Sequence, residues 1–215
     1  LGSYTLSKWI DDATWYSSGV EWADQRNIRL NRGLGDQDRR QMLALSWVWE
    51  LPFFQQPGGA RRALLGGWSV SGIATFYAGQ PVRLQTYKDN DYDGNSKGDR
   101  PDVVGAWKLN PNRPRAQAIE AWFRQDAFEP NKPAQLGSAG RNFVIGPGSK
   151  HFDIAVLKDF RITERQRFQF RCEMFNAFNH TQFGNPSSNV ASSSFGLVGG
   201  ARAPRLVQFG LKLLF

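Results

Sequence analysis

An acidic run near the middle of the chain has the residue types and spacing of a cation site. Residues 89–95 read Asp-Asn-Asp-Tyr-Asp-Gly-Asn, which reproduces the start of a calcium loop, D-x-D-x-D-G. Oxygens at alternate positions converge on a cation, and Gly94 permits the sharp turn. The twelfth position is Arg100 rather than Glu, and no flanking helices are evident, so the run is not an EF-hand. The candidate calcium ligands are Asp89, Asp91, Asp93, Asn95 and Asp99, and a solvated acidic loop without calcium is the simpler alternative.

The sequence contains no recognisable catalytic constellation. His151 and His180 are the only histidines, and neither is spaced with carboxylates or thiols as a metal ligand; His180 is interpreted as the end of a strand. The glycine-rich stretch 137–148 contains Arg141 but lacks the strand before it and the helix after it that a phosphate loop requires. The single Cys172 excludes an internal disulfide framework. We therefore expect no enzymatic activity and no organic cofactor.

Composition restricts the class of protein further. The 215 residues are 40% hydrophobic with a mean hydropathy of −0.49, and no stretch approaches the roughly 20 apolar residues of a spanning helix. The net charge is +8, but the basic residues are dispersed and no nucleic-acid-binding motif accompanies them. We expect no nucleic-acid partner. Basic strand ends and loops suit an anionic solute or lipopolysaccharide phosphates instead.

Alternating segments predict the elements that position these residues. In the terminal run 205–215, positions 207, 209, 211, 213 and 215 are all apolar, while the other positions are small or polar in the middle. This pattern is typical of a lipid-facing strand of a transmembrane β-barrel, although a soluble edge strand can show it too. Six strands are predicted, over about residues 3–11, 41–51, 67–78, 151–162, 167–178 and 205–215. The fold class predicted is all-β, an antiparallel meander from the C-terminal part of a barrel.

The connections alternate between long and short, as they do in outer-membrane barrels. A short helix is predicted over about residues 115–124, inside the longest connection. In the fifth strand, apolar and charged residues separate sharply between the two faces. The side chains expected to face the barrel lumen are Arg167, Gln169, Arg171 and Glu173.

Several phrases resemble a known family. They include Gly98-Asp-Arg-Pro-Asp102, Trp122-Phe-Arg-Gln-Asp-Ala-Phe128, Gly137-Ser-Ala-Gly-Arg-Asn142, Phe170-Arg-Cys-Glu-Met-Phe-Asn-Ala-Phe-Asn-His180 and Phe209-Gly-Leu-Lys-Leu-Leu-Phe215. In this order they resemble the C-terminal barrel region of TonB-dependent outer-membrane receptors. The closest group is the Oar-like one, whose members carry an N-terminal carboxypeptidase-regulatory-like domain. The resemblance covers essentially all of residues 1–215.

The resemblance implies a location, a function and a set of partners. It implies a receptor in the bacterial outer membrane that imports a bulky solute, with the plug and N-terminal domains absent from this sequence. The implied partners are the rest of the barrel and the plug, TonB through the missing N-terminal part, lipopolysaccharide, and the barrel assembly machinery, which would read Phe215. Lys158 departs from an apolar lipid face and is expected to extend to the membrane interface. The alternative function is a secreted β-rich carbohydrate-binding or adhesive module.

Overall fold

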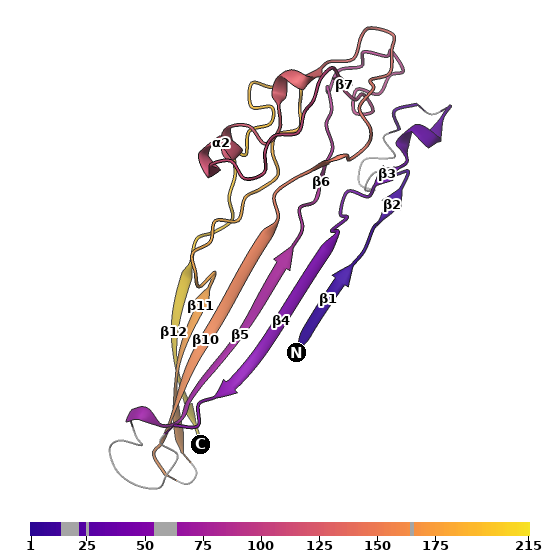
Figure 1. Ribbon diagram of the computed structural model, residues 1–215. Coiled ribbons are helices and arrows are strands. Elements are labelled where there is room, and N and C mark those ends of the chain that lie inside the picture. The colour runs from indigo at the N-terminus through magenta and orange to yellow at the C-terminus, as the bar shows by residue number, and fades with distance from the viewer. Residues whose placement is uncertain (14–21, 25, 54–63, 164–165) are drawn as a thin grey trace.

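Six antiparallel strands form the main sheet of the protein (Figure 1). The computed structural model describes residues 1–13, 22–24, 26–53, 64–163 and 166–215. The strand order is β1-β4-β5-β10-β11-β12, so each of these strands pairs with its neighbours along the chain. Their bounds are β1 (Gly2–Leu6), β4 (Gln41–Glu50), β5 (Trp68–Tyr77), β10 (Ser149–Arg161), β11 (Arg167–Phe175) and β12 (Leu206–Leu214). The structure confirms the predicted antiparallel meander.

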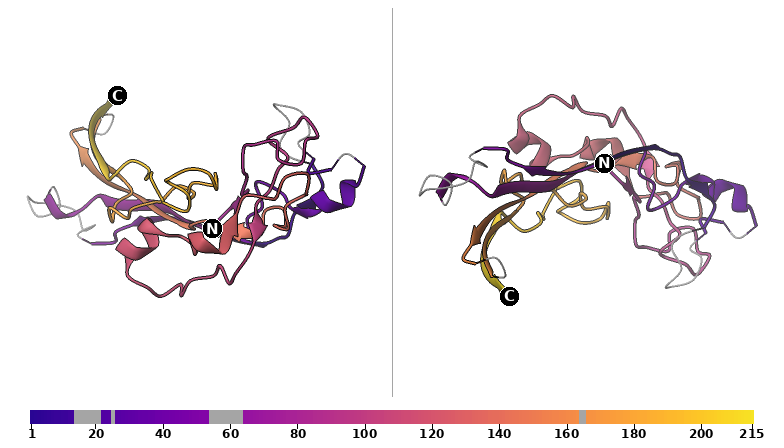
Figure 2. Two further views of the ribbon diagram at one scale, coloured as in Figure 1. Left: turned by 90° about the horizontal axis from the view of Figure 1, so that it is seen from above. Right: turned by 90° about the horizontal axis from the view of Figure 1, so that it is seen from below.

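The sheet has one end with long connections and one end with short connections. The connections 7–40, 78–148 and 176–205 leave from what we call the loop end, and we call them the first, second and third loops. The opposite turn end carries the connections 51–67 and 162–166 and the C-terminus (Figure 1). Seen from above and below, the sheet twists so that β12 turns out of the plane of β4 and β5 (Figure 2). Among the described residues, no helix has the length and hydrophobicity to cross a membrane.

Small elements organise the loops, and the sequence indicated only the helix among them. Three two-residue ribbons join β2 (Ile10–Asp11) to β3 (Gly33–Leu34), β6 (Pro81–Val82) to β9 (Val144–Ile145) and β7 (Asp102–Val103) to β8 (Phe128–Glu129). The helical turns are η2 (Ile28–Asn31), α2 (Arg115–Glu120) and η3 (Gln125–Ala127). Two residues are too few to show an alternating pattern, so these ribbons exist only through their tertiary partners.

The first predicted strand was too long. It was expected over residues 3–11, but β1 ends at Leu6 and the chain then leaves the main sheet. The Trp9 N–H donates to Asp38 Oδ1 over 2.7 Å, and Ile10 pairs with Leu34 in the first loop. These partners lie in the first loop rather than in β4. The alternation of apolar and polar residues therefore could not show that β1 ends at Leu6.

The predicted helix was also too long, because it was expected to reach residue 124. Helix α2 ends at Glu120, and Ala121 is extended with φ −150° and ψ 104°. The Trp122 N–H donates to the Gly196 carbonyl and the Arg124 N–H to the Trp107 carbonyl, each over 2.9 Å. These donors bind the third loop and an earlier part of the second loop instead of continuing the helix.

The fifth strand ends at Phe175, three residues earlier than expected. Asn176 has a left-handed φ of 51° and its side chain closes a turn, because Oδ1 accepts from the His180 N–H over 2.9 Å. The interpretation of His180 as the end of a strand was therefore wrong. His180 lies within this turn, past the strand.

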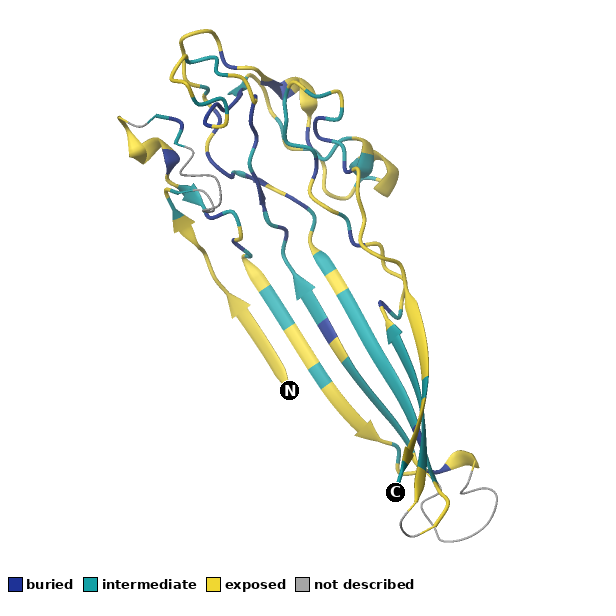
Figure 3. Cartoon of the chain, turned by 180° about the vertical axis from the view of Figure 1, so that it is seen from behind, coloured by how far each residue is buried: buried dark blue, intermediate teal, exposed yellow. Residues whose placement is uncertain are grey.

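Burial is concentrated in the loops and not in the sheet (Figure 3). A hydrophobic cluster, which we call the loop core, joins the second and third loops. It consists of Val82, Leu84, Phe123, Ala127, Phe128, Val144 and Phe195. Ala74 is a rare buried side chain on the described part of the sheet. The second and third loops therefore share a packed core of their own.

Candidate functional site: the loops and the two faces of the sheet

The main sheet has one apolar face and one polar face. Cross-strand partners share a face, so the register assigns each side chain to one of them. The apolar face carries aromatic and aliphatic side chains, among them Tyr4, Leu45, Trp47, Trp49, Phe152, Val156, Phe170, Phe209, Leu211 and Leu213. The polar face carries mostly small, hydroxyl and charged side chains, among them Ser3, Ser46, Ser71, Thr75, Asp153, Ala155, Asp159, Arg171, Glu173 and Lys212, although Val48, Ile73 and Leu157 lie on it too. Many apolar-face side chains are exposed, so this face requires apolar surroundings.

Gly72 and Lys158 interrupt the apolar face within its central strands, and the structure accounts for both. Gly72 lies under the Trp47 ring, and a Cβ at this position would collide with that ring. Lys158 is 2% exposed, and its Nζ donates to the Gly66 carbonyl at the turn end. Its ammonium lies 4.8 Å from the centroid of the Phe160 ring. The ammonium thus reaches the end of the sheet and lies over the Trp68 and Phe160 rings.

The expected lumen-facing residues of β11 all lie on the polar face. Gln169 Nε2 donates to Asp159 Oδ1 over 3.0 Å. Arg171 Nη2 donates to Glu173 Oε1 over 2.6 Å. Arg167 lies opposite Arg161, at the turn end of the same face. The strand therefore separates its charged residues from its apolar residues as the sequence pattern indicated.

Three phenylalanines form the centre of the loop core. The Phe123 ring lies 5.3 Å from Phe128 and 5.0 Å from Phe195, centroid to centroid. Phe128 and Phe195 are 5.8 Å apart and perpendicular. Edge-to-face packing of this kind stabilises beyond the area it buries. The second and third loops are thereby fixed to each other.

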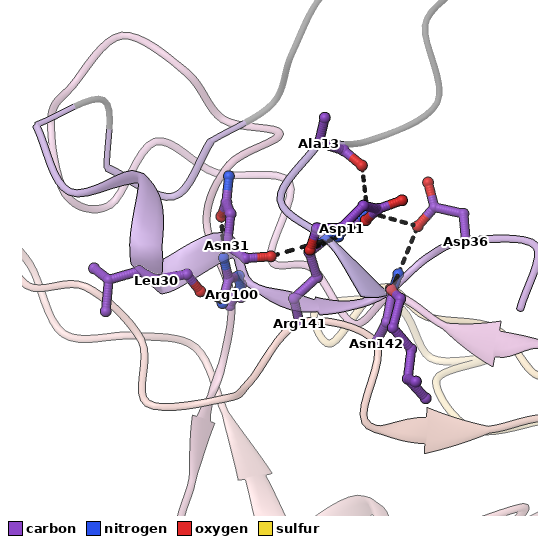
Figure 4. Close-up of polar contacts among 9 residues, drawn as sticks. Asp11, Ala13, Leu30, Asn31, Asp36, Arg100, Arg141 and Asn142 are labelled. Carbon is purple, nitrogen blue, oxygen red and sulfur yellow. Dashed lines mark hydrogen bonds and ion pairs between the residues drawn. The ribbon is translucent and has the colours of Figure 1, made fainter. Parts of the chain in front are cut away.

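A buried polar cluster fixes the first loop to the second (Figure 4). We call it the polar clamp, and its centre is Arg141, whose side chain is 3% exposed. Arg141 pairs with the Asp11 carboxylate and donates to the carbonyl oxygens of Asp11 and Ala13. Asn142 Nδ2 donates to Asp36 Oδ1 over 2.6 Å. Asp11 and Asp36 belong to the first loop, whereas Arg141 and Asn142 belong to the second. The clamp therefore joins segments that are more than 100 residues apart in the sequence.

A second buried arginine completes the clamp. Arg100 Nη1 donates to the Leu30 carbonyl over 3.0 Å, and Nη2 donates to Asn31 Oδ1. Burial lowers the pKa of Arg100 to about 10, and the positive charges of Arg83 and Arg141 add to this effect. Arg100 therefore stays protonated at neutral pH. The sequence analysis noted Arg141 only in a glycine-rich stretch and Arg100 only as a departure from the EF-hand pattern, because the partners of both lie in a distant loop.

The structure brings three of the five candidate calcium ligands together. Oxygens of Asp89, Asp91 and Asp93 lie within 4.8 Å of one another. Gly94 has φ 88°, the left-handed conformation that the motif requires. The carboxylates also serve the loop itself, since Asp89 Oδ2 accepts from the Gly94 N–H over 3.0 Å and Asp93 Oδ1 from the Asn95 N–H over 2.7 Å.

The other two candidate ligands hold the acidic loop in place. Asn95 Nδ2 donates to the Trp22 carbonyl over 3.4 Å, and Asn95 Oδ1 accepts from the Lys97 N–H over 3.2 Å. Asp99 is buried, and its Oδ2 accepts from the Asn90 N–H over 2.6 Å. Calcium binding stays a prediction for this loop.

Titration of Asp91 provides a test of that prediction. Burial raises the pKa of Asp91 to about 6, and the negative charges of Asp99 and Asp93 add to the shift. Because the folded pKa is raised, this carboxyl favours the folded loop below its unfolded pKa of about 4, and the contribution is lost as the pH rises through about 6. A carbon-13 titration of the Asp91 carboxyl should therefore show a midpoint near 6.

Calcium and protons should compete for this carboxylate. Added calcium should lower the Asp91 midpoint if the loop binds calcium, and magnesium should do so less because it dehydrates reluctantly. Asp126, whose exposed carboxylate pairs with Arg124 over 2.7 Å, is the control and should not respond. An Asp91 midpoint unaffected by calcium would identify a solvated acidic loop instead.

A sheet with an apolar face, a polar face and long loops at one end is the wall of an outer-membrane β-barrel. The comparison with protein families agrees, because residues 1–208 match the outer membrane beta barrel domain. The chain belongs to this family and is located in the bacterial outer membrane. No curated protein and no solved structure matches the chain. In such barrels the apolar face contacts lipid, the polar face lines the lumen and the long loops are external.

Cysteine labelling in membranes should test this orientation. In an Arg171→Cys, Cys172→Ser variant, the thiol on the polar face should react with a water-soluble reagent that cannot enter lipid. In the natural protein Cys172, on the apolar face opposite Phe209, should not react. The opposite pattern would mean that the register of β11 is displaced by one residue, which exchanges the two faces.

Proposed function

We propose that this chain forms the C-terminal part of the barrel of a TonB-dependent receptor that imports a bulky solute. The proposal is supported by the sequence segments that resemble this family, because they contain residues whose contacts hold the external loops together. Asp99 and Arg100 belong to the first phrase, Phe123 and Phe128 to the second, and Arg141 to the third. The resemblance therefore extends to residues that hold the loops together, and not only to alternating strands.

One observation carries the proposal: packed external loops lie at one end of the sheet (Figure 1), and the mostly polar face of that sheet has a depression along its middle. A depression of about 390 Å³ on this face is bordered by small side chains such as Ser46, Ser71 and Ala155. Asp153 and Glu173 also line it, together with the apolar side chains of Val48, Ile73 and Phe175. Small side chains leave space in the lumen, and carboxylates supply polar contacts. A transport protein needs both an external surface that captures a solute and a polar interior that admits it.

The proposed mechanism uses binding rather than catalysis. External loops capture the solute, the lumen admits it, and a plug is displaced when TonB pulls on the N-terminal part of the receptor. The plug, the remaining strands, TonB, the assembly machinery and lipopolysaccharide are the proposed partners. A secreted carbohydrate-binding module, the alternative, does not fit the outer-membrane location of the family. The alternative also includes an adhesive role for the external loops. A test must therefore distinguish adhesion from solute import.

Depletion of solutes from the growth medium tests the proposal. We expect the wild-type strain to remove at least one solute that remains when either this gene or the tonB gene is deleted. Restoring the natural gene should restore its removal. If the gene deletion alters attachment to surfaces or polysaccharide but no TonB-dependent uptake, the adhesive role replaces the proposed one.

A further inference from the structure

Two adjacent rows of side chains, each crossing β4, β5, β10 and β11, form the depression on the polar face. Successive cross-strand partners make up the first row, which consists of Val48, Ser71, Ala155 and Glu173. The second row lies next to it towards the loop end and consists of Ser46, Ile73, Asp153 and Phe175. The small side chains of Ser71 and Ala155 lie between larger ones, which leaves a hollow of about 390 Å³.

The Asp153 carboxylate is fixed at one side of this depression. Its Oδ1 accepts from the Asn176 N–H over 2.9 Å. Asn176 is buried and closes the turn after β11, so the donor is itself held in place. Within the described residues, no group donates a hydrogen bond to Asp153 Oδ2, and Asp153 takes part in no ion pair. The carboxylate therefore presents one oxygen, and a negative charge without a partner, to a ligand.

The other polar groups of the depression are also hydrogen-bond acceptors. Glu173 Oε1 accepts from Arg171 Nη2 over 2.6 Å, which offsets its charge and leaves Oε2 without a donor among the described residues. The Ser46 and Ser71 hydroxyls lie in the same depression, and none of the described residues that line it is basic. Such a set of acceptors is complementary to a cation that carries N–H donors.

The rest of the depression is apolar. Ile73 lies directly opposite Asp153 on β5, and Val48 and Phe175 border the hollow on its two sides. All three side chains are exposed, so an apolar group that covers them would release water from their surfaces. A cation bound beside the Phe175 ring would also gain a cation–π interaction. The complementary ligand therefore combines a positive charge with an apolar group.

We propose that this depression binds an ammonium group of the imported solute together with an apolar group attached to it. Asp153 accepts a charge-assisted hydrogen bond from the ammonium, and Val48, Ile73 and Phe175 cover the apolar group. The inference rests on the proposed import function, because that function makes the ligand a solute that passes along the lumen. It names the substrate class as organic ammonium compounds.

Three small probes that differ in charge test this site. Phenethylammonium, phenethyl alcohol and phenylacetate share an aromatic ring and carry a positive charge, no charge and a negative charge. Each would be titrated by calorimetry into the complete natural receptor, purified in detergent. Phenethylammonium should bind, and the other two should bind at least about tenfold more weakly because they cannot supply a charged donor to Asp153.

Two variants locate the binding site, and a third is the matched control. Asp153→Asn keeps the Oδ1 that accepts from Asn176 but removes the charge, so it should weaken phenethylammonium binding by about tenfold to a hundredfold. Ala155→Phe keeps Asp153 but fills the hollow, so it should abolish binding. Asp159→Asn is the control: Asp159 lies on the same strand and face and accepts from Gln169 over 3.0 Å, but it does not line the depression. This variant should bind as the natural protein does.

Several outcomes would overturn the inference. They are equal binding of the three probes, unchanged binding in both Asp153→Asn and Ala155→Phe, and an equal loss in Asp159→Asn. Absence of binding to the natural receptor would also overturn it, because a basic side chain from another part of the receptor would then be the occupant. Calorimetry requires no energy coupling, so binding without TonB-dependent uptake would support the ammonium site while contradicting the proposed import. TonB-dependent uptake of other solutes, without probe binding, would support import and overturn the ammonium site.

Discussion

Deleting Phe215 is expected to prevent insertion of the protein into the outer membrane, leaving it in the periplasm. The Phe215 ring continues the apolar series of β12 but is 94% exposed. Complete burial of such a side chain contributes only about 2–3 kcal/mol, and Phe215 buries almost none of its area within the chain. If the ring served packing alone, its deletion would give a slightly weakened barrel that is still inserted. Recognition of Phe215 during assembly, which the resemblance to TonB-dependent receptors implies, predicts aggregation instead.

Two variants separate these explanations. Phe209→Ala removes an aromatic ring from the same strand and face, where Phe209 stacks on Phe170 at 6.1 Å, but it keeps Phe215. It should insert normally, as should Phe215→Tyr. The measurement is the heat-modifiable fraction in outer membranes. Normal insertion of the protein without Phe215 would refute its role as an assembly signal.

Replacing Arg141 by Ala is expected to release the first loop from the second while leaving the sheet intact. The change removes a cation that is 3% exposed and leaves Asp11, 23% exposed, without its partner. Breaking a buried ion pair costs about 3–5 kcal/mol, and we expect about 3 kcal/mol because Asp11 retains some access to water. Arg141→Lys should be intermediate, because it keeps the charge but loses the planar donors that contact Asp11 and Ala13.

Hydrogen exchange in membranes should detect this release. Backbone amides of η2 and β3, whose residues contact the clamp, should exchange about a hundredfold faster in Arg141→Ala, while β10 and β11 should not change. Arg124→Ala is the control, because it breaks an ion pair that is exposed on both sides, at 52% and 68%. Exposed pairs contribute little, so it should exchange as the natural protein does. Equal exchange in the Arg141→Ala and Arg124→Ala variants would show that the clamp does not hold the first loop.

The sequence by itself determined the main strands and their two faces. In β11 the apolar series Phe168, Phe170, Cys172 and Met174 alternates with the polar series Arg167, Gln169, Arg171 and Glu173 over one continuous stretch. A period of two over eight or more residues is a local property, so it can be predicted without knowledge of partners. The same holds for β4, β5, β10 and β12, whose ends lie within two residues of the predicted ones.

The tertiary structure alone decided how the loops are organised. Nothing near Arg141 in the sequence indicates that Asp11 is its partner, because the two are 130 residues apart. The same applies to Phe123 and Phe195, which meet in the loop core from different loops. The acidic loop depends on both the sequence pattern and the tertiary structure. The spacing of Asp89, Asp91 and Asp93 predicted that they lie together, whereas only the structure shows that Asp99 accepts a hydrogen bond from the Asn90 N–H. Loop residues pack through contacts between segments that are distant in the sequence, and a local sequence pattern cannot predict such contacts.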